Sequence, residues 1–467
     1  MQSRSGLKAG WILLLSIASI PALAQQQNAF SVKQCVDYAL KNSGQVKNAL
    51  LDIKIQEQTN REYTAAAYPR LSGSFGANYF PQVATQVFPN FIAAATYGVL
   101  QNEGVKNGSG NPIVAPGDFG FVQAQFGTRY TASAGLEFSQ ILFDGQVFVG
   151  LQARSTALLL AQKTAELTEV GIRANIHKIY YQLVAARKQV AALDANIQQI
   201  EKVLHDTKAM YQNGFVEKLD IDKLNVTLAN IQTQKNQILR QIESGYLGLK
   251  LLMGMPAQDG LELTDTVSEE VLKTDMLEAS YNYEDRKEVQ QLKLARRLNA
   301  YNVKRYELTR IPTVALFGQY STNAQRNKFN FFDFSQKWFP SSLIGLKVSV
   351  PIFEGFGKNA RIEKAKLELK KTDNTMDMLK LAVDNEVAQS RIDFQKAILT
   401  LETQKRNREL ATKVYQLTTK KYEQGLGSNL EISTAQTELR VADTNYFNAL
   451  YDAIIARINF DKATGKL

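Results

Sequence analysis

The sequence has very few residues that could crosslink the chain or bind a transition metal. Among 467 residues there are one cysteine, Cys35, and two histidines. One cysteine excludes an internal disulfide framework, and these counts are too small for a site built from His and Cys ligands alone. Cys35 lies at helical spacing with Val32, Val36 and Leu40, so we predict that its thiol is packed and unreactive.

Catalytic signatures are also missing. The sequence contains no G-x-S-x-G, Walker-type or H-E-x-x-H motif, and its carboxylates do not follow the spacing of metal ligands. We therefore predict a protein that is not an enzyme and that carries no cofactor and no metal ion.

No apolar run is long enough for a membrane-spanning helix, which needs roughly 20 residues. The run Trp11–Ile20 follows Arg4 and Lys8 and precedes a site of small residues ending at Ala24. This order is typical of a secretory signal peptide. We predict that residues 1–24 are this peptide and that cleavage follows Ala24. Cys35 lies too far along the chain to serve as a lipid-attachment site.

The formal net charge is +10. Lysine and arginine are interspersed with aspartate, glutamate and glutamine along helix-like segments. Mixed charge of this kind favours a solvated helical surface over a nucleic-acid site, so we predict no nucleic-acid partner.

An internal repeat is the most informative feature of the chain. Phe143-Asp144-Gly145 corresponds to Phe353-Glu354-Gly355, and Tyr211–Gly214 corresponds to Tyr422–Gly425. Each half is predicted to run helix, strand, loop, strand, long helix, turn, helix.

The repeat divides the chain into a first part, 25–265, and a second part, 266–467. Both parts contain segments in which apolar and polar residues alternate, a pattern that predicts strands. These segments are 70–80, 128–142, 313–322 and 343–353. Each segment is about as long as a tilted membrane strand. The intervening segments, 81–127 and 323–341, are predicted to be long loops.

Heptad patterns predict a long helical hairpin in each part, over 147–253 and 358–465. In the first hairpin, apolar residues recur in steps of four and three from Ile172 to Leu204 and resume at Leu224, which is the period of a coiled coil. The second hairpin has a more polar seam, interrupted by Gln404 and Arg408. Its apolar positions are Val383, Val387, Phe394, Leu401 and Leu417.

The strands require an assembly of several chains. Only helices and closed barrels satisfy backbone hydrogen bonds in lipid, and four strands cannot close a barrel. Barrels of about eight strands are filled by side chains, whereas wider barrels enclose water. Three chains would contribute twelve strands, with polar residues such as Glu137 and Lys347 facing a lumen.

These features resemble the TolC family of outer-membrane efflux proteins. The resemblance rests on the duplicated order of alternating strands, the turn Pro351–Gly357, and long helices broken at Tyr-x-x-Gly, and it covers about 30–467. It implies a mainly α-helical fold with a membrane β-barrel, in which a homotrimer forms a twelve-stranded barrel continued by a periplasmic helical tunnel. It also implies a place in the cell outer membrane, contact with outer-membrane lipid, and docking to a periplasmic adaptor (membrane fusion protein) and an inner-membrane pump.

The resemblance also implies a gate at the periplasmic end. The family's tip tyrosine matches Tyr422, and the aspartate that it bonds matches Asp220. The first of two inward acidic positions matches Glu431, whereas Thr434 replaces the second acid and Gly427 replaces an arginine.

Both hairpin tips are predicted to dock the adaptor. The residues that form these tips are Tyr211, Gly214, Gly425 and Gly427. The glycines permit the positive φ that ends many helices.

Two other functions remain open from the sequence. The chain could be a conduit for protein in a type I secretion system rather than a channel for small solutes in a tripartite pump. A structural or adhesive coiled-coil trimer is the third alternative, but such a stalk has no need of two amphipathic strand pairs.

Overall fold

The computed structural model describes residues 28–266, 272, 280–333 and 335–467. The predicted signal peptide, 1–24, lies outside the described residues. The chain forms two compact units. The helical unit comprises the described parts of Met1–Gln56, Thr156–Arg297 and Lys370–Leu467, and the sheet unit comprises Glu57–Ser155 and Leu298–Leu369. Both units therefore take residues from both sequence repeats.

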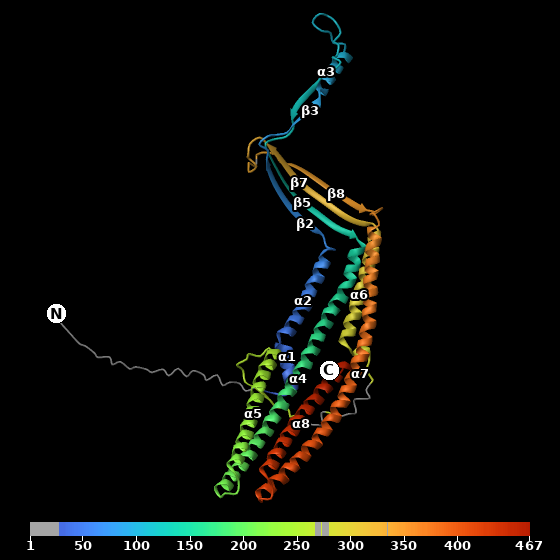
Figure 1. The fold of residues 1–467 in the computed structure, drawn as a ribbon. Helices are drawn as coiled ribbons and strands as arrows, with labels where there is room; N and C mark the ends of the chain where they lie inside the picture. Colours follow the sequence, from blue (N-terminus) through green and yellow to red (C-terminus); the bar gives the residue numbers. More distant parts are fainter. Residues whose placement is uncertain (1–27, 267–271, 273–279, 334) are drawn as a thin grey trace, which may run out of the picture. The chain divides into compact units, whose positions relative to one another are not determined.

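The sheet unit contains one antiparallel sheet of four strands (Figure 1). The strands are β2 (Arg70–Tyr79), β5 (Tyr130–Phe143), β7 (Thr313–Arg326) and β8 (Phe339–Ser349), in the order β2-β5-β7-β8. Both strand pairs of the repeat thus join into a single sheet, with β5 against β7 at its centre. A bulge interrupts the β5–β7 ladder between Ile141 and Phe143.

The connection between β2 and β5, predicted as a loop over 81–127, has secondary structure of its own. It contains β3 (Thr85–Pro89), α3 (Phe91–Asn102) and β4 (Phe121–Gln125), and β3 pairs with β4. The loop prediction was wrong here because turn residues such as Asn107-Gly108 occupy only the connection between α3 and β4. The second predicted loop, 323–341, is shortened at both ends because β7 and β8 extend into it.

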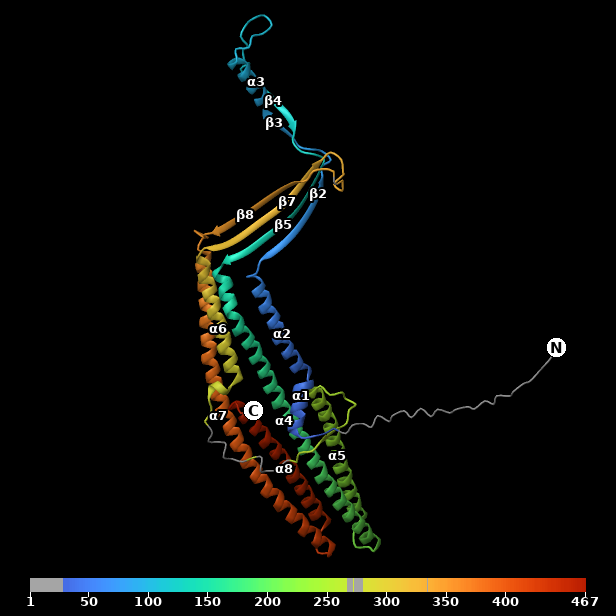
Figure 2. The same cartoon turned by 180° about the vertical axis from the view of Figure 1, so that it is seen from behind.

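Two helical hairpins follow the strand pairs, as the heptad patterns predict (Figure 2). The first consists of α4 (Gly145–Gln212) and α5 (Lys218–Met253), and the second of α7 (Gly357–Glu423) and α8 (Asn429–Ala463). With 68 residues, α4 is about 100 Å long at the usual rise per residue. Such helices belong to both units, because α4 and α7 each begin in the sheet unit and end in the helical unit.

Shorter elements complete the two units. The helices are α1 (Val32–Asn42), α2 (Gly44–Ala65) and α6 (Lys287–Glu307), with 3-10 turns η3 (Tyr283–Asp285) and η4 (Leu308–Arg310). A parallel pair, β1 (Asn28–Phe30) with β6 (Leu261–Leu263), ties the start of the described chain to the end of the first repeat.

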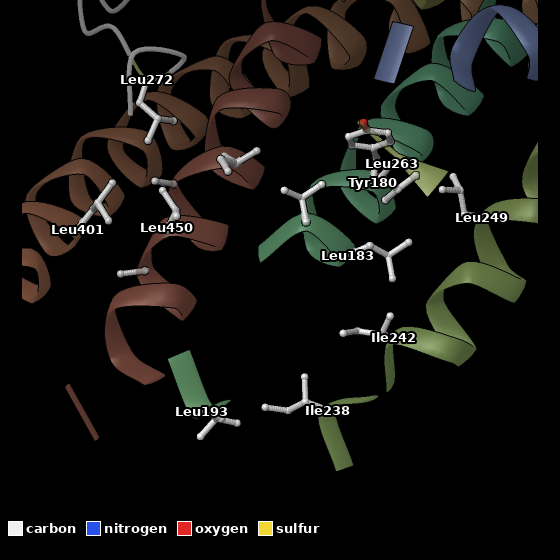
Figure 3. Packing of buried hydrophobic residues seen from close by; sticks show 14 of the residues in the cluster. Tyr180, Leu183, Leu193, Ile238, Ile242, Leu249, Leu263, Leu272, Leu401 and Leu450 are labelled. Atoms are coloured by element: carbon white, nitrogen blue, oxygen red, sulfur yellow. The ribbon is translucent and has the colours of Figure 1, made fainter. Parts of the chain in front are cut away.

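The first hairpin packs along its predicted heptad seam. Ile176 and Ile200 on α4 and Leu224 and Leu249 on α5 are fully buried. Figure 3 shows Leu183 of α4 beside Ile242 of α5. Burial of such apolar side chains contributes roughly 1.5–3 kcal/mol each, so this seam is the main source of cohesion in the hairpin.

The second hairpin follows its predicted seam only in part. Val383, Val387, Phe394 and Leu401 are buried, but Leu417 is 63% exposed. Leu417 is displaced because the tyrosines at 415 and 422, which are seven residues apart and both buried, occupy the seam instead.

Cys35 is packed as predicted. It lies in the core on α1 and is free of any disulfide, and burial raises the pKa of its thiol to about 12. The thiol is therefore protonated and unreactive at neutral pH. Within the described ranges, no helix combines the length and the apolar composition that crossing a bilayer demands.

Candidate functional site

One face of the four-stranded sheet is apolar. Leu71 of β2 is paired with Phe138 of β5, which is paired with Gly318 of β7, and opposite residues of an antiparallel pair lie on the same face. Phe75 on this face is 70% exposed. Further large side chains on this face are also exposed: Leu71, Tyr79, Leu136, Tyr320, Ile344, Leu346 and Val348. So large an apolar surface indicates contact with lipid or protein.

The opposite face of the sheet is mainly polar, although Phe317, Phe339 and Leu343 also lie on it. Ser72 is paired with Glu137, and Glu137 with Gln319. Further polar side chains of this face include Ser74, Asn78, Thr131, Ser133, Ser321, Asn323, Ser341 and Lys347. Ser321 and Ser341 share a hydrogen bond of 2.8 Å between their hydroxyl oxygens. Such side chains are readily hydrated, so the sheet has one face suited to an apolar environment and one face suited to water.

The two hairpin tips have the same backbone turn. Gly214 has φ 76° and Gly425 has φ 73°. In each tip the glycine N–H donates to the carbonyl three residues earlier, and the next N–H donates to the carbonyl five residues earlier. This pair of bonds closes the helix, and it depends on a left-handed residue.

Apolar side chains project from both tips. Phe215 is 79% exposed, and Leu219 is exposed beside it on the first tip. Leu426 and Leu430 occupy the equivalent positions of the second tip and are also exposed. The tips thus offer apolar surface that nothing in the described chain covers.

Tyr422 is anchored within the chain rather than displayed at the tip. Its side chain is buried, and its hydroxyl oxygen lies 2.9 Å from that of Thr207 on α4. Thr207 donates its own proton to the Val203 carbonyl at 2.8 Å, so Tyr422 must donate to Thr207. The predicted bond from Tyr422 to Asp220 is therefore not formed within the chain, because the single phenolic proton is used elsewhere.

Asp220 has a different partner, Asn429. The Asn429 amide donates to a carboxylate oxygen of Asp220 at 2.9 Å and to its backbone carbonyl at 3.0 Å. The other carboxylate oxygen accepts from the Glu217 N–H at 3.4 Å, at the start of α5. Asn429 is buried at the first position of α8. Asp220 therefore joins the two tips through a residue that the sequence analysis did not single out.

Gly427 lies where the chain turns back against the end of α7. A Cβ atom at this position would lie 3.2 Å from the Tyr422 nitrogen. An arginine here would require the turn to open slightly, which gives a physical reason for the glycine in this sequence.

Glu431 is exposed on the first turn of α8. Its backbone N–H donates to the Ser428 hydroxyl at 3.2 Å, and its carboxylate lies 3.9 Å from the Lys421 ammonium. Thr434 is exposed with it, but Ala435 is buried. The free face at this point of α8 therefore includes Glu431 and Thr434 but not Ala435, one turn further along, which packs toward the neighbouring helices.

A buried polar line runs along α8 between the hairpins. Asn429, Gln436 and Asp443 recur every seven residues and are buried. Asp443 accepts from Arg408 at 2.6 Å and from Asn196 at 3.3 Å, which links α8 to α7 and α4. The heptad spacing of these three polar residues was the sequence signal that could have revealed the line.

Comparison with known proteins gives a consistent match. The family model described as outer membrane efflux protein matches residues 35–255 and 283–466. The outer membrane protein TolC of Vibrio cholerae is 20% identical over 340 residues, which cover 72% of this chain and 77% of the relative. The folds of CusC and of VceC from Vibrio cholerae superimpose with TM-scores of 0.73 and 0.69, each at 16% identity. The CusC alignment covers 96% of this chain and 95% of CusC, and the VceC alignment covers 93% and 96%.

Proposed function

The chain belongs to the outer membrane efflux protein family, and from this membership we propose that three copies form one passive export channel through the outer membrane. A periplasmic adaptor and an inner-membrane pump would deliver the exported solutes to it. The four-stranded sheet, with one apolar and one polar face, carries this proposal.

The edges of the sheet support an assembly of several copies. β2 and β8 each have a strand neighbour on one side only, and unpaired backbone groups are untenable in hydrocarbon. Because every neighbouring pair in the sheet is antiparallel, β8 of one copy runs opposite to β2 of the next. An antiparallel ladder can therefore continue from copy to copy until the ring closes.

The number of copies follows from the width that a channel needs. Two copies would supply eight strands, and barrels of that size are filled by side chains. Three copies supply twelve strands, which leaves space inside. Ser74, Glu137 and Lys347 would then line water, and Phe75 and Ile344 would face lipid.

The hairpin tips are the proposed docking surface for the adaptor. Phe215, Leu219, Leu426 and Leu430 are exposed there, and exposed apolar side chains that lie together often mark a protein contact. Gly214 and Gly425 fix the turns that present them. Tyr211, which is exposed on the first tip, extends this surface.

Neighbouring residues on opposite faces of β2 provide a direct test. Ser74→Cys places a thiol on the polar face and Phe75→Cys places one on the apolar face, while the native Cys35 is buried. In single-channel recordings of the reconstituted protein, a charged, water-soluble thiol reagent should reduce the conductance of Ser74→Cys and leave Phe75→Cys unchanged. Mass measurement in detergent should give a trimer. A monomer without conductance, or equal block of both variants, would contradict the channel.

A further inference from the structure

The segment between β2 and β5 forms an arm, comprising β3, α3, β4 and their connections over 80–129. We propose that this arm packs against the equivalent arms of the two other subunits and closes the outer mouth of the channel. This inference rests on the trimeric channel proposed above.

The arm has an ordered internal structure. The Asn90 side chain accepts from the Ala93 N–H at 3.0 Å and caps α3, and the Asn90 N–H donates to the Gly120 carbonyl at 2.9 Å. The rings of Tyr97 and Phe119 lie 5.6 Å apart between their centres. These contacts hold α3 against the segment that leads into β4, so the same side chains of α3 always face outward.

That exposed face is apolar. Phe91, Ala95 and Val99 follow one another at intervals of four residues along α3, and all are exposed, Val99 by 61%. Ile92 is exposed beside them, and no residue of α3 is buried. A helix of this composition is normally covered by another surface. Nothing in the described residues covers this face of α3, so its partner must come from outside the single chain.

The root of the arm lies next to a neighbouring subunit. Tyr79 of β2 is paired with Tyr130 of β5, and the Phe80 N–H donates to the Arg129 carbonyl at 2.7 Å. These pairs end the sheet away from Gly145, where α4 begins. Because β2 is an edge strand, the next subunit of a closed barrel would pair directly with it. Three arms would thus start at the boundaries between subunits, on the rim opposite the helices.

The dimensions allow the arms to meet. Twelve strands about 4.8 Å apart and tilted by about 40° enclose a ring with a radius of about 12 Å. α3 has 12 residues and is therefore about 18 Å long. Each arm can reach the axis of the barrel.

The charge of the arm favours copies of itself over other partners. Glu103, Lys106, Asp118 and Arg129 are the only charged residues in 80–129, and α3 contains none. Helices that lie on a membrane surface usually carry a basic face, which α3 lacks. Gly98 faces open space and would permit close approach of a second helix. Three identical neutral helices can pack together without bringing like charges into contact.

An apolar closure has a clear consequence for transport. A hydrophobic constriction excludes water until it is forced open. Polar solutes outside the cell would then be hindered from entering the barrel, while cargo delivered from the periplasm would displace the arms.

Crosslinking of the full-length trimer in outer-membrane vesicles tests the contact. Val99→Cys should give a dimer band with a short bis-maleimide, because Cys35 is buried and does not react. Val114→Cys is the matched control, since Val114 is exposed in the same arm but does not lie on α3. We expect crosslinking at Val99 to be at least about tenfold faster, as for groups held together by assembly. Equal rates at both positions would indicate random collisions and overturn the proposal.

The same variants separate the other ways in which α3 could be covered. If lipid covers α3, Val99→Cys will neither crosslink nor react with a water-soluble maleimide. If nothing covers it, the thiol will react quickly and no dimer will form. Either result overturns the contact between arms.

A charge on the exposed face tests the closure itself. Val99→Glu should keep the trimer and raise its resting single-channel conductance at least about twofold, because three carboxylates would repel one another and admit water. An intact trimer with the conductance of the parent protein would contradict the proposed closure by the arms, but it would remain consistent with the proposed channel. Loss of the trimer or of all conductance in the parent protein would instead contradict the proposed function.

Discussion

The two hairpin tips have nearly the same backbone but different side-chain environments. Gly214 and Gly425 adopt the same left-handed conformation and close their helices with the same pair of bonds. The equivalent tyrosines differ sharply, since Tyr211 is 44% exposed and Tyr422 only 4%. The backbone conformation of each turn is thus determined locally, whereas the exposure of its tyrosine side chain depends on which residues of the other hairpin pack against it.

The acidic residues of the tips show the same asymmetry. Asp220 is held by Asn429, whereas among the described residues the carboxylate of Glu431, at the equivalent place in the second tip, has only a long, exposed contact with Lys421. Near the tips, the second hairpin therefore contacts the first through Tyr422 with Thr207, Asn429 with Asp220 and Glu423 with Lys202. Tyr211 and Glu431 remain open to contacts outside the chain.

The largest expected difference between the tips comes from removing the two carboxylates. Asp220→Ala should destabilise the tips by about 1.5–3 kcal/mol, the usual contribution of a hydrogen bond to a charged group. Glu431→Ala should change local stability by less than about 0.5 kcal/mol, as at other exposed positions. Hydrogen exchange of tip peptides in the detergent-solubilised trimer measures both. Equal protection of the tip amides from exchange in the two variants would contradict the proposed difference between Asp220 and Glu431.

Much of the fold could be predicted because the relevant patterns are local and long. The four strands alternate in polarity over their length, and the heptads of α4 and α5 extend over many turns. The helix and the two strands within 81–127 could not be predicted. α3 shows no clear alternation between a polar and an apolar face, and β3 and β4 have only five residues each. Leu417 was misplaced because Tyr415 and Tyr422, which are amphipathic, fill the seam.

The site was less predictable than the fold. The turns at Gly214 and Gly425 could be read from the sequence, because a glycine after a helix has few other roles. The partner of Tyr422 could not, since Thr207 and Asp220 are both polar and lie on different helices of the first hairpin. Asn429 was missed because a polar residue at a helix start is normally a cap, and only the packing of α8 shows that it is buried.

A second pair of changes tests whether the two turns are as similar as their backbones. Gly214→Val and Gly425→Val should each cost about 1–3 kcal/mol locally, because a β-branched residue is strained at positive φ. Both should weaken adaptor binding and leave the barrel inserted. The matched controls are Gly214→Asn and Gly425→Asn, because asparagine tolerates this conformation. Pull-down of the adaptor and heat-modifiability of the trimer provide the measurements. Normal binding by both valine variants would show that the tips are not the docking surface.

A smaller effect distinguishes the partners of Tyr422. Tyr422→Phe should cost about 0.5–1.5 kcal/mol, since it removes one hydrogen bond between neutral groups. Combined with Thr207→Val it should cost less than the sum of the two single changes, because both remove the same bond. Combined with Asp220→Ala it should be additive within about 0.5 kcal/mol. Thermal unfolding of the four proteins in each cycle gives these values. Coupling to Asp220 and not to Thr207 would support the bond that the sequence predicted.

The smallest expected effect concerns the free acidic residue, Glu431. If the exposed face of α8 lines the lumen of a trimer, three copies of Glu431 form a ring that attracts cations and offers oxygen ligands to hard multivalent ions. Exposed charge interactions are weak, about 0.2–1 kcal/mol, and Thr434 adds no second acid. Glu431→Gln should therefore weaken block by a trivalent cation from the periplasmic side about two- to fivefold, without a change in stability. Glu438→Gln removes the same charge seven residues further along the exposed face and should alter block less, because it lies further from the tip. Equal block in the parent and in Glu431→Gln would place this residue outside the conduction path.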